Sequence, residues 1–130
     1  IIPLKMLDSY LKDFNDFIFS IKLGGKKIEP EIISPKLVRD IKKLAPFGYG
    51  NPQPVFASLK LKPMSPRLIG DGSHFKLLVP AKERYLEAVA FGMADLFNRV
   101  QKERVDLAYS IGEDEWEGNK RVVLRIKDVK

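Results

Sequence analysis

The chain has 130 residues, of which 45% are hydrophobic and 31% are charged, as in a folded domain with one hydrophobic core. It has no cysteine and a single histidine, which excludes a disulfide scaffold, a thiolate metal site and a cluster of imidazole ligands. The net charge is +6, and the basic residues concentrate in segments 22–84 and 119–130. One face of the fold should therefore be basic, either for solubility or to bind a polyanion.

No apolar run approaches the roughly 20 residues of a membrane-spanning helix, and no signal-like segment is present. We therefore expect a cytoplasmic protein without membrane contact. The chain starts at Ile1 rather than at methionine, directly in an amphipathic pattern. This start indicates a fragment of a longer polypeptide.

Two helices are predicted in the N-terminal part of the chain. Residues 3–19 carry apolar side chains at steps of three and four, which indicates an amphipathic helix. A turn at Gly24–Gly25 and a short strand over 26–33, limited by Pro30, should follow. The pair Ser34–Pro35 then predicts a helix start, because the serine hydroxyl can accept a hydrogen bond from a free backbone N–H and proline suits the first helical residue. The apolar stripe of this second helix comprises Leu37, Val38, Ile41, Leu44 and Ala45, and Pro46 should end it.

Residues 44–56 read Leu-Ala-Pro-Phe-Gly-Tyr-Gly-Asn-Pro-Gln-Pro-Val-Phe, and little of this run can be helix or central strand. The prolines fix φ and the glycines permit positive φ, so the run encodes a series of turns. Flexible tethers lack side chains that need burial, so the aromatic residues of this run indicate that it packs against another part of the fold. We expect Phe47 and Tyr49 to wedge this connector onto the body of the fold.

After Pro54 the hydrophobic period changes to two, which is typical of half-buried antiparallel strands. The pattern predicts five strands, near 58–62, 74–79, 85–91, 105–111 and 121–126, and a short helix over 93–100 between the third and the fourth. Leu59 and Leu61 should face the core, and Asp71–Gly72 should form a tight turn. This order of elements favours a mainly β fold, the five-stranded Greek-key barrel called the OB-fold, over other five-stranded barrels.

Several segments together resemble a known family. They are the 44–56 run, His74-Phe-Lys-Leu, Glu87-Ala-Val-Ala-Phe-Gly, Arg104-Val-Asp-Leu-Ala-Tyr, Glu115-Trp-Glu-Gly and Arg125-Ile-Lys-Asp-Val. In this order they look like the C-terminal OB-fold domain of RecJ-family single-strand-specific DNA exonucleases, over about residues 28–130. The resemblance implies three parts: 1–27 as the end of a preceding DHHA1-like domain, 28–54 as a connector and 55–130 as the OB-fold domain.

The resemblance also implies a limit to the activity of this fragment. In that family a metal-dependent 5′-to-3′ exonuclease activity on single-stranded DNA, used in repair and recombination, belongs to N-terminal domains with Asp- and His-rich motifs. Such two-metal chemistry needs clustered carboxylate and imidazole ligands, and this sequence has a single histidine. The Gly-Gly-His motif of the family's DHHA1 domain is also absent, because Gly24–Gly25 is followed here by Lys26. We expect no catalysis, no metal and no cofactor in this fragment, with Mn²⁺ or Mg²⁺ held elsewhere in the parent protein.

Single-stranded DNA is the expected ligand, because an OB-fold binds it with cations for the phosphates and flat side chains for base stacking. The predicted DNA-binding residues are Lys60, Lys62, Arg67, His74, Lys76, Phe91, Lys120 and Arg121.

Several of these residues also have a plainer explanation. Phe91 could plug a barrel end, His74 could cap a turn and the lysines could protect a sheet edge. For Trp116, packing against the barrel rim is preferred over base stacking.

Two other functions stay open at this point. The barrel face or the acidic loop 113–117 could dock onto a replication or repair protein, or onto the parent's own catalytic domains. An RNA-binding OB domain of a translation factor is the third reading, since only the family resemblance favours DNA.

Overall fold

The computed structural model describes residues 26–43, 45–47 and 53–130. The helix predicted over 3–19, the turn at Gly24–Gly25 and Tyr49 lie outside the described residues. One sheet dominates the described part, with seven strands in the spatial order β1-β2-β6-β7-β5-β4-β3. The strands are β1 (Lys26–Lys27), β2 (Phe56–Leu61), β3 (Met64–Ile69), β4 (His74–Ala81), β5 (Arg84–Ala90), β6 (Val105–Trp116) and β7 (Asn119–Val129).

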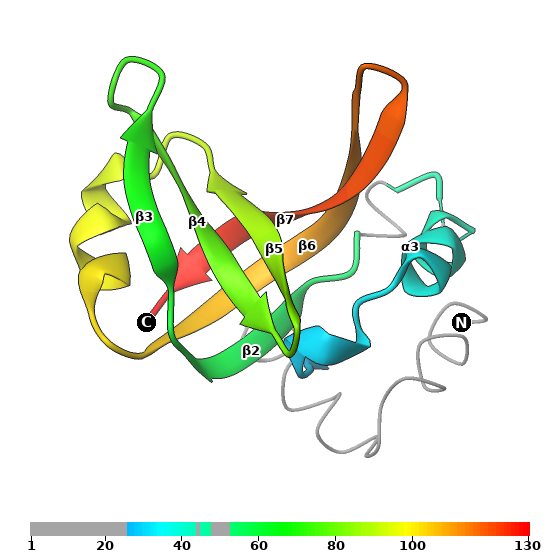
Figure 1. Cartoon of the computed structure of the whole chain (residues 1–130), viewed down its shortest axis with the longest axis horizontal. Coiled ribbons are helices and arrows are strands. Elements are labelled where there is room, and N and C mark those ends of the chain that lie inside the picture. The colour runs from blue at the N-terminus through cyan, green and yellow to red at the C-terminus, as the bar shows by residue number, and fades with distance from the viewer. Residues whose placement is uncertain (1–25, 44, 48–52) are drawn as a thin grey trace.

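The sheet curls back on itself (Figure 1). Strands β2 and β3 have four other strands between them in the sheet, although only Lys62 and Pro63 separate them in the chain. The strand register shifts on both sides of this bend, between Ser58 and Leu61 and between Met64 and Arg67. Such bulges bend and twist a strand, which lets the chain pass from one end of the sheet to the other.

The bulge in β2 overturns the predicted alternation of that strand. Lys60 has a φ of 54°, and the extra residue changes which side chains face inward. Ser58 is therefore fully buried and Leu59 is 44% exposed, whereas Leu61 is buried as expected. The error arose because a period of two was assumed to run through an unbroken strand.

The core lies inside the curl of the sheet. Along β4 every second residue is buried, and Phe75, Leu77 and Val79 belong to the core cluster together with Leu86, Ala88 and Ala90 of β5. The 3-10 helix η2 (Ala94–Gln101) packs on this core through Phe97, whose ring centroid lies 5.7 Å from that of Phe75. Phe47 also packs against the core, as predicted for the connector.

Helix α3 (Pro35–Lys42) forms where the sequence predicts the second helix. The Ser34 hydroxyl accepts a hydrogen bond from the backbone N–H of Leu37 at 3.1 Å, and Pro35 is the first helical residue. Leu37, Val38 and Ile41 are buried on its inner side. Lys42 forms an ion pair with Glu113 of β6, which ties the helix to the β6–β7 hairpin.

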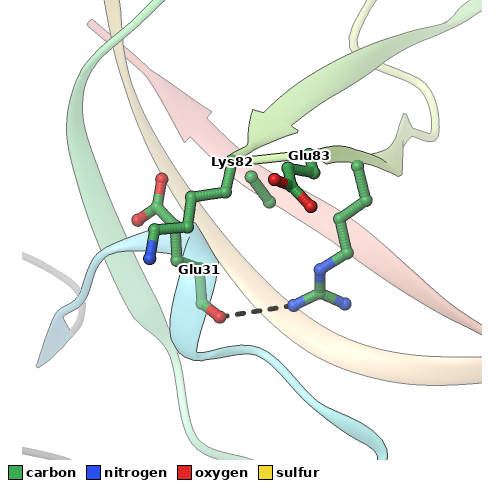
Figure 2. Close-up of a pocket in the computed structure, with 5 residues that line it drawn as sticks. Glu31, Lys82 and Glu83 are labelled. Carbon is green, nitrogen blue, oxygen red and sulfur yellow. Dashed lines mark hydrogen bonds between the residues drawn. The ribbon is translucent and has the colours of Figure 1, made fainter.

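Before α3 the chain forms a 3-10 helix, η1 (Pro30–Ile32), which is fixed to the β4–β5 turn. The Arg84 guanidinium donates to the backbone carbonyl of Glu31 at 3.4 Å and also to that of Ile33. Figure 2 shows the depression between these segments, lined also by Ala81, Lys82 and Glu83. Arg84 in this depression already binds two backbone carbonyls, so the depression is the place where η1 is attached to the β4–β5 turn.

Three further expectations about the elements need correction. The predicted strand over 26–33 shortens to Lys26–Lys27, because Pro30 begins η1. The sheet has seven strands rather than five, since β1 and β3 also pair. The segment predicted as a helix over 93–100 forms a 3-10 helix. In the described part of the chain, no helix is long and apolar enough to cross a membrane.

Candidate nucleic-acid interface

The side chains of β3, β4, β5 and β7 that point away from the core form one surface, here called the outer sheet face. In β4 these are His74, Lys76 and Leu78, which alternate with the buried core residues. The register aligns Arg67, Lys76, Val89 and Arg125 on four neighbouring strands. Cross-strand neighbours on one face lie about 5 Å apart, so this row brings three cationic side chains across the sheet.

An exposed aromatic ring stands at one end of the outer sheet face. Phe91 is 63% exposed, and its ring meets the edge of His74 at 5.5 Å between centroids with an interplanar angle of 70°. His74 is held in turn by the backbone N–H of Gly92, which donates to Nδ1 at 2.7 Å. The imidazole thus supports the exposed phenyl ring, which is available to stack on a flat ligand.

A second exposed aromatic residue stands at the other end of β5. Tyr85 is 58% exposed and pairs with Pro80 of β4. Tyr85 and Phe91 are six residues apart on the same side of the strand, which corresponds to about 20 Å. The two rings therefore bracket the charged centre of the face.

Glu87 lies at this centre and holds two cations from different strands. Its Oε1 atom lies 3.0 Å from Lys76 Nζ, and its Oε2 atom lies 3.3 Å from Arg121 Nη1. The Lys76 and Glu87 side chains are mostly buried, with 27% and 20% exposed, while that of Arg121 is 53% exposed. These pairs join β4, β5 and β7 on the outer sheet face.

Arg125 and Asp114 form a second ion pair beside the first. Arg125 Nη2 lies 3.4 Å from Asp114 Oδ1. The guanidinium lies over Gly112, where an added Cβ atom would come within 2.0 Å of Nη1. Gly112 therefore leaves the room that this arginine occupies.

The structure brings together five of the eight predicted DNA-binding residues: Arg67, His74, Lys76, Phe91 and Arg121 on or beside the outer sheet face. The other three lie elsewhere. Lys60 and Lys62 are exposed at the β2–β3 bend, where the Lys60 backbone N–H donates to Asp106 Oδ1 at 2.8 Å. Lys120 pairs with Glu115 near the tip of the β6–β7 hairpin.

Sequence reasoning missed three residues of this face: Tyr85, Glu87 and Arg125. The signal for Arg125 was available, because Arg121, Val123 and Arg125 occupy every second position of one strand. Glu87 gave no such signal, since its two partners come from strands whose pairing the sequence does not specify.

The acidic hairpin is partly neutralised where it meets α3. A hydrogen bond from Lys42 lowers the pKa of the Glu113 carboxyl against the opposing effect of burial, and the positive charge of that lysine acts in the same direction as the hydrogen bond. Glu115 and Glu117 at the tip are exposed. The side chain of Trp116 is outside the described ones, so its predicted packing stays a prediction.

Among the described residues, no group of three or more His, Cys, Asp or Glu side chains is placed to hold a metal ion. The arrangement of the outer sheet face instead suits binding: exposed rings at its ends, and cations that converge on carboxylates between them. A flexible polyanion with flat groups matches this pattern.

In a comparison with known families, residues 26–128 match the family described as RecJ OB domain. A comparison with curated protein sequences finds no match.

Two solved structures of RecJ from Thermus thermophilus are similar to this chain, each with 26% sequence identity. The structure in complex with Mn²⁺ gives a TM-score of 0.59 over 74% of this chain, and the structure in complex with Mg²⁺ gives 0.61 over 79%. This chain spans only 14% and 15% of those two chains. A putative aspartyl-tRNA synthetase from Leishmania major Friedlin is similar in fold, with a TM-score of 0.52 and 11% identity over 82% of this chain and 20% of that chain.

Proposed function

The chain belongs to the family of RecJ OB domains, and from this premise we propose that it binds single-stranded DNA as an accessory domain of a RecJ-like exonuclease. The observation that carries the proposal is the outer sheet face, where the exposed Phe91 ring and the cations Arg67, Lys76 and Arg121 lie on one surface. Stacking and phosphate neutralisation are the two contributions that sequence-tolerant binding of single strands requires.

The proposal places the ligand on the usual surface of an OB-fold. If the two-residue strand β1 is left aside and β2 and β3 are counted as two halves of one bent first strand, five strands remain, and β4 and β5 are the second and third. The face of these two strands, with the loops joining strands 1–2 and 4–5, is where OB-folds bind oligonucleotides. In Figure 1 the β3–β4 and β6–β7 hairpins both project beyond the sheet at the top of the view.

The proposed role is to hold and guide a strand, while bond cleavage takes place in other domains of the parent protein. That parent would be a 5′-to-3′ exonuclease of DNA repair and recombination with Mn²⁺ or Mg²⁺ in its catalytic domains. Its own catalytic domains would be the nearest partners of this domain, in the cytoplasm. Replication or repair proteins are further candidate partners.

Titration of a fluorescent oligothymidylate with the protein at several salt concentrations tests this proposal. Single-strand affinity should fall with salt, with a logarithmic slope of about −0.7 for each phosphate contact. Phe91→Ala should weaken binding about fivefold or more, since each stacked base contributes roughly 1–3 kcal/mol. Arg67→Glu should make the slope shallower.

Two matched variants control for the chemistry of these changes. Lys82→Glu reverses a charge at the β4–β5 turn, and Leu59→Ala removes an exposed apolar side chain from β2. Both should bind within about twofold of the unmodified protein. An affinity that does not depend on salt, or losses as large in the controls, would refute the proposal.

A further inference from the structure

The Glu87 carboxylate occupies a site that has the form of an anion clamp. One of its oxygens faces Lys76 Nζ at 3.0 Å, and the other faces Arg121 Nη1 at 3.3 Å. The two cations come from β4 and β7, on either side of β5, so the sheet itself sets their separation. A phosphate diester presents two anionic oxygens to cationic donors in a similar way.

We propose that Glu87 holds the place of a phosphate group and acts as a built-in competitor for the nucleic acid. A bound strand would displace the carboxylate from Lys76 and Arg121 and put its own phosphate there. The proposal rests on the function proposed above and adds how its affinity is set. In the free protein these two cations are already neutralised. The free energy gained on binding is therefore only the difference between their interaction with a phosphate and their interaction with the Glu87 carboxylate.

The Arg125–Asp114 pair repeats this arrangement on the next strands of the same face. Asp114 lies opposite Arg121 in the register and accepts a hydrogen bond from Arg125. It therefore also neutralises a cation that faces outward. Arg125 is aligned with Val89 and Lys76 in the cationic row. On this face Glu87 thus neutralises Lys76 and Arg121, and Asp114 neutralises Arg125.

This arrangement predicts weak binding that can be strengthened by removing a negative charge. Partly exposed ion pairs contribute modestly, each up to about fivefold in an equilibrium constant. Glu87→Gln releases Lys76 and Arg121 from their ion pairs and retains the shape of the side chain. The variant should bind oligothymidylate about two- to tenfold more tightly than the unmodified protein at physiological salt. Its salt slope should become steeper by about 0.7 to 1.4, for one or two added phosphate contacts.

Glu83→Gln is the matched control. It removes the same charge from the exposed turn of the same hairpin, four residues from Glu87 and about 13 Å along the chain. At physiological salt this separation exceeds the screening length of about 8 Å, so the control should bind like the unmodified protein. Asp114→Asn is a second, independent variant and should also tighten binding.

A second measurement does not depend on DNA. Inorganic phosphate, compared with sodium chloride at equal ionic strength, should raise the unfolding temperature of Glu87→Gln more than that of the unmodified protein. Circular dichroism of each variant verifies the fold, and if Glu87→Gln does not fold, the comparison is made with Asp114→Asn against Glu83→Gln.

The outcomes separate this inference from the proposed function. If the unmodified protein binds the oligonucleotide with a salt dependence but Glu87→Gln binds no more tightly than Glu83→Gln, the inference is wrong and the proposed function stands. Weaker binding by Glu87→Gln has the same meaning, because Glu87 would then position the two cations. If no variant binds the oligonucleotide while phosphate selectively stabilises Glu87→Gln, the clamp is supported and the proposed function fails.

Discussion

The hydroxyl groups of Ser58 and Tyr109 show how polar side chains are accommodated in the core of this domain. Ser58 Oγ donates to the backbone carbonyl of Ile28 at 2.7 Å and lies 2.7 Å from the Tyr109 hydroxyl. Both residues are fully buried. Because Ser58 gives its one hydroxyl proton to Ile28, the phenol is the donor to Ser58. Burial raises the pKa of the Tyr109 hydroxyl well above its ordinary value, which keeps this donor protonated at alkaline pH as well. This chain of bonds connects β2, β6 and the segment after β1.

Removal of the Ser58 hydroxyl should destabilise the domain more than removal of the Tyr109 hydroxyl. Ser58→Ala leaves a buried phenol and the Ile28 carbonyl without this partner, which costs about 1–3 kcal/mol. Tyr109→Phe removes one bond, while Ser58 keeps its bond to Ile28, so the cost should be about 1 kcal/mol. Urea unfolding of the three proteins measures these differences.

Ser110→Ala is the control for the Ser58 variant, because it makes the same change at a buried position of β6. The Ser110 hydroxyl is buried and has no hydrogen-bond partner in the structure. Its removal should leave the free energy of unfolding unchanged or slightly higher. A cost equal to that of Ser58→Ala would show that loss of volume, rather than of hydrogen bonding, dominates.

The same residues show why part of the fold could not be predicted from the sequence. The alternation around 58–62 predicted Ser58 outside and Leu59 inside, and one bulged residue at Lys60 reverses both. A bulge has no reliable signal in a single sequence, because its cause is the bend that closes the sheet. In β4 no bulge intervenes, and His74 and Lys76 alternate with buried residues, as the period of two predicts.

At the scale of elements, local chemistry decided which predictions succeeded. Helix α3 was predicted from Ser34–Pro35 and its apolar stripe, all of which act within one turn or two. Strand β3 was missed, since its sequence Met-Ser-Pro-Arg-Leu-Ile does not alternate and its place depends on pairing with β4. The ion pairs of Glu87 were missed for the same reason, because they require the pairing of β5 with β7.

The β6–β7 hairpin divides into two parts that should differ in stability. Near the sheet, β7 pairs with both β6 and β5, and its register with β5 covers Val123 to Arg125. Beyond Val123, towards the tip, the described pairing of β7 is with β6 alone. In Figure 1 this part rises away from the sheet. A two-stranded ribbon without further support is only marginally stable in water.

Amide hydrogen exchange should therefore be faster in the outer part of the hairpin than at its base. We expect the paired amides of residues 113–116 and 119–122 to exchange at least tenfold faster than those of 107–111 and 124–126, measured by NMR at pH 7. Lys42→Met, which removes the ion pair to Glu113, should increase exchange in the outer part only. Equal protection along the whole hairpin would mean that contacts other than the β6–β7 pairing stabilise its outer part.

At the scale of the whole molecule, the net charge of +6 attracts any polyanion and cannot by itself select single strands. Duplex DNA carries the higher charge density, so an interface made only of cations would favour it. Selection must come from the exposed rings of the outer sheet face, because a ring can stack only on a base that is free of its neighbours. The ratio of the two affinities therefore reports on the site rather than on the charge.

Competition of unlabelled single-stranded and duplex DNA with equal numbers of phosphates, against a fluorescent oligothymidylate at fixed salt, measures this ratio. The unmodified protein should prefer the single strand by about tenfold, within the roughly 1–3 kcal/mol that one stacked base contributes. Phe91→Ala should lower the preference several-fold, because the loss of the ring weakens single-strand binding and leaves the cations that hold a duplex. Lys82→Glu should weaken both ligands by the same small factor, because it changes only the overall charge. A duplex that competes as well as the single strand, or a preference that survives the loss of Phe91, would show that the rings do not select the ligand.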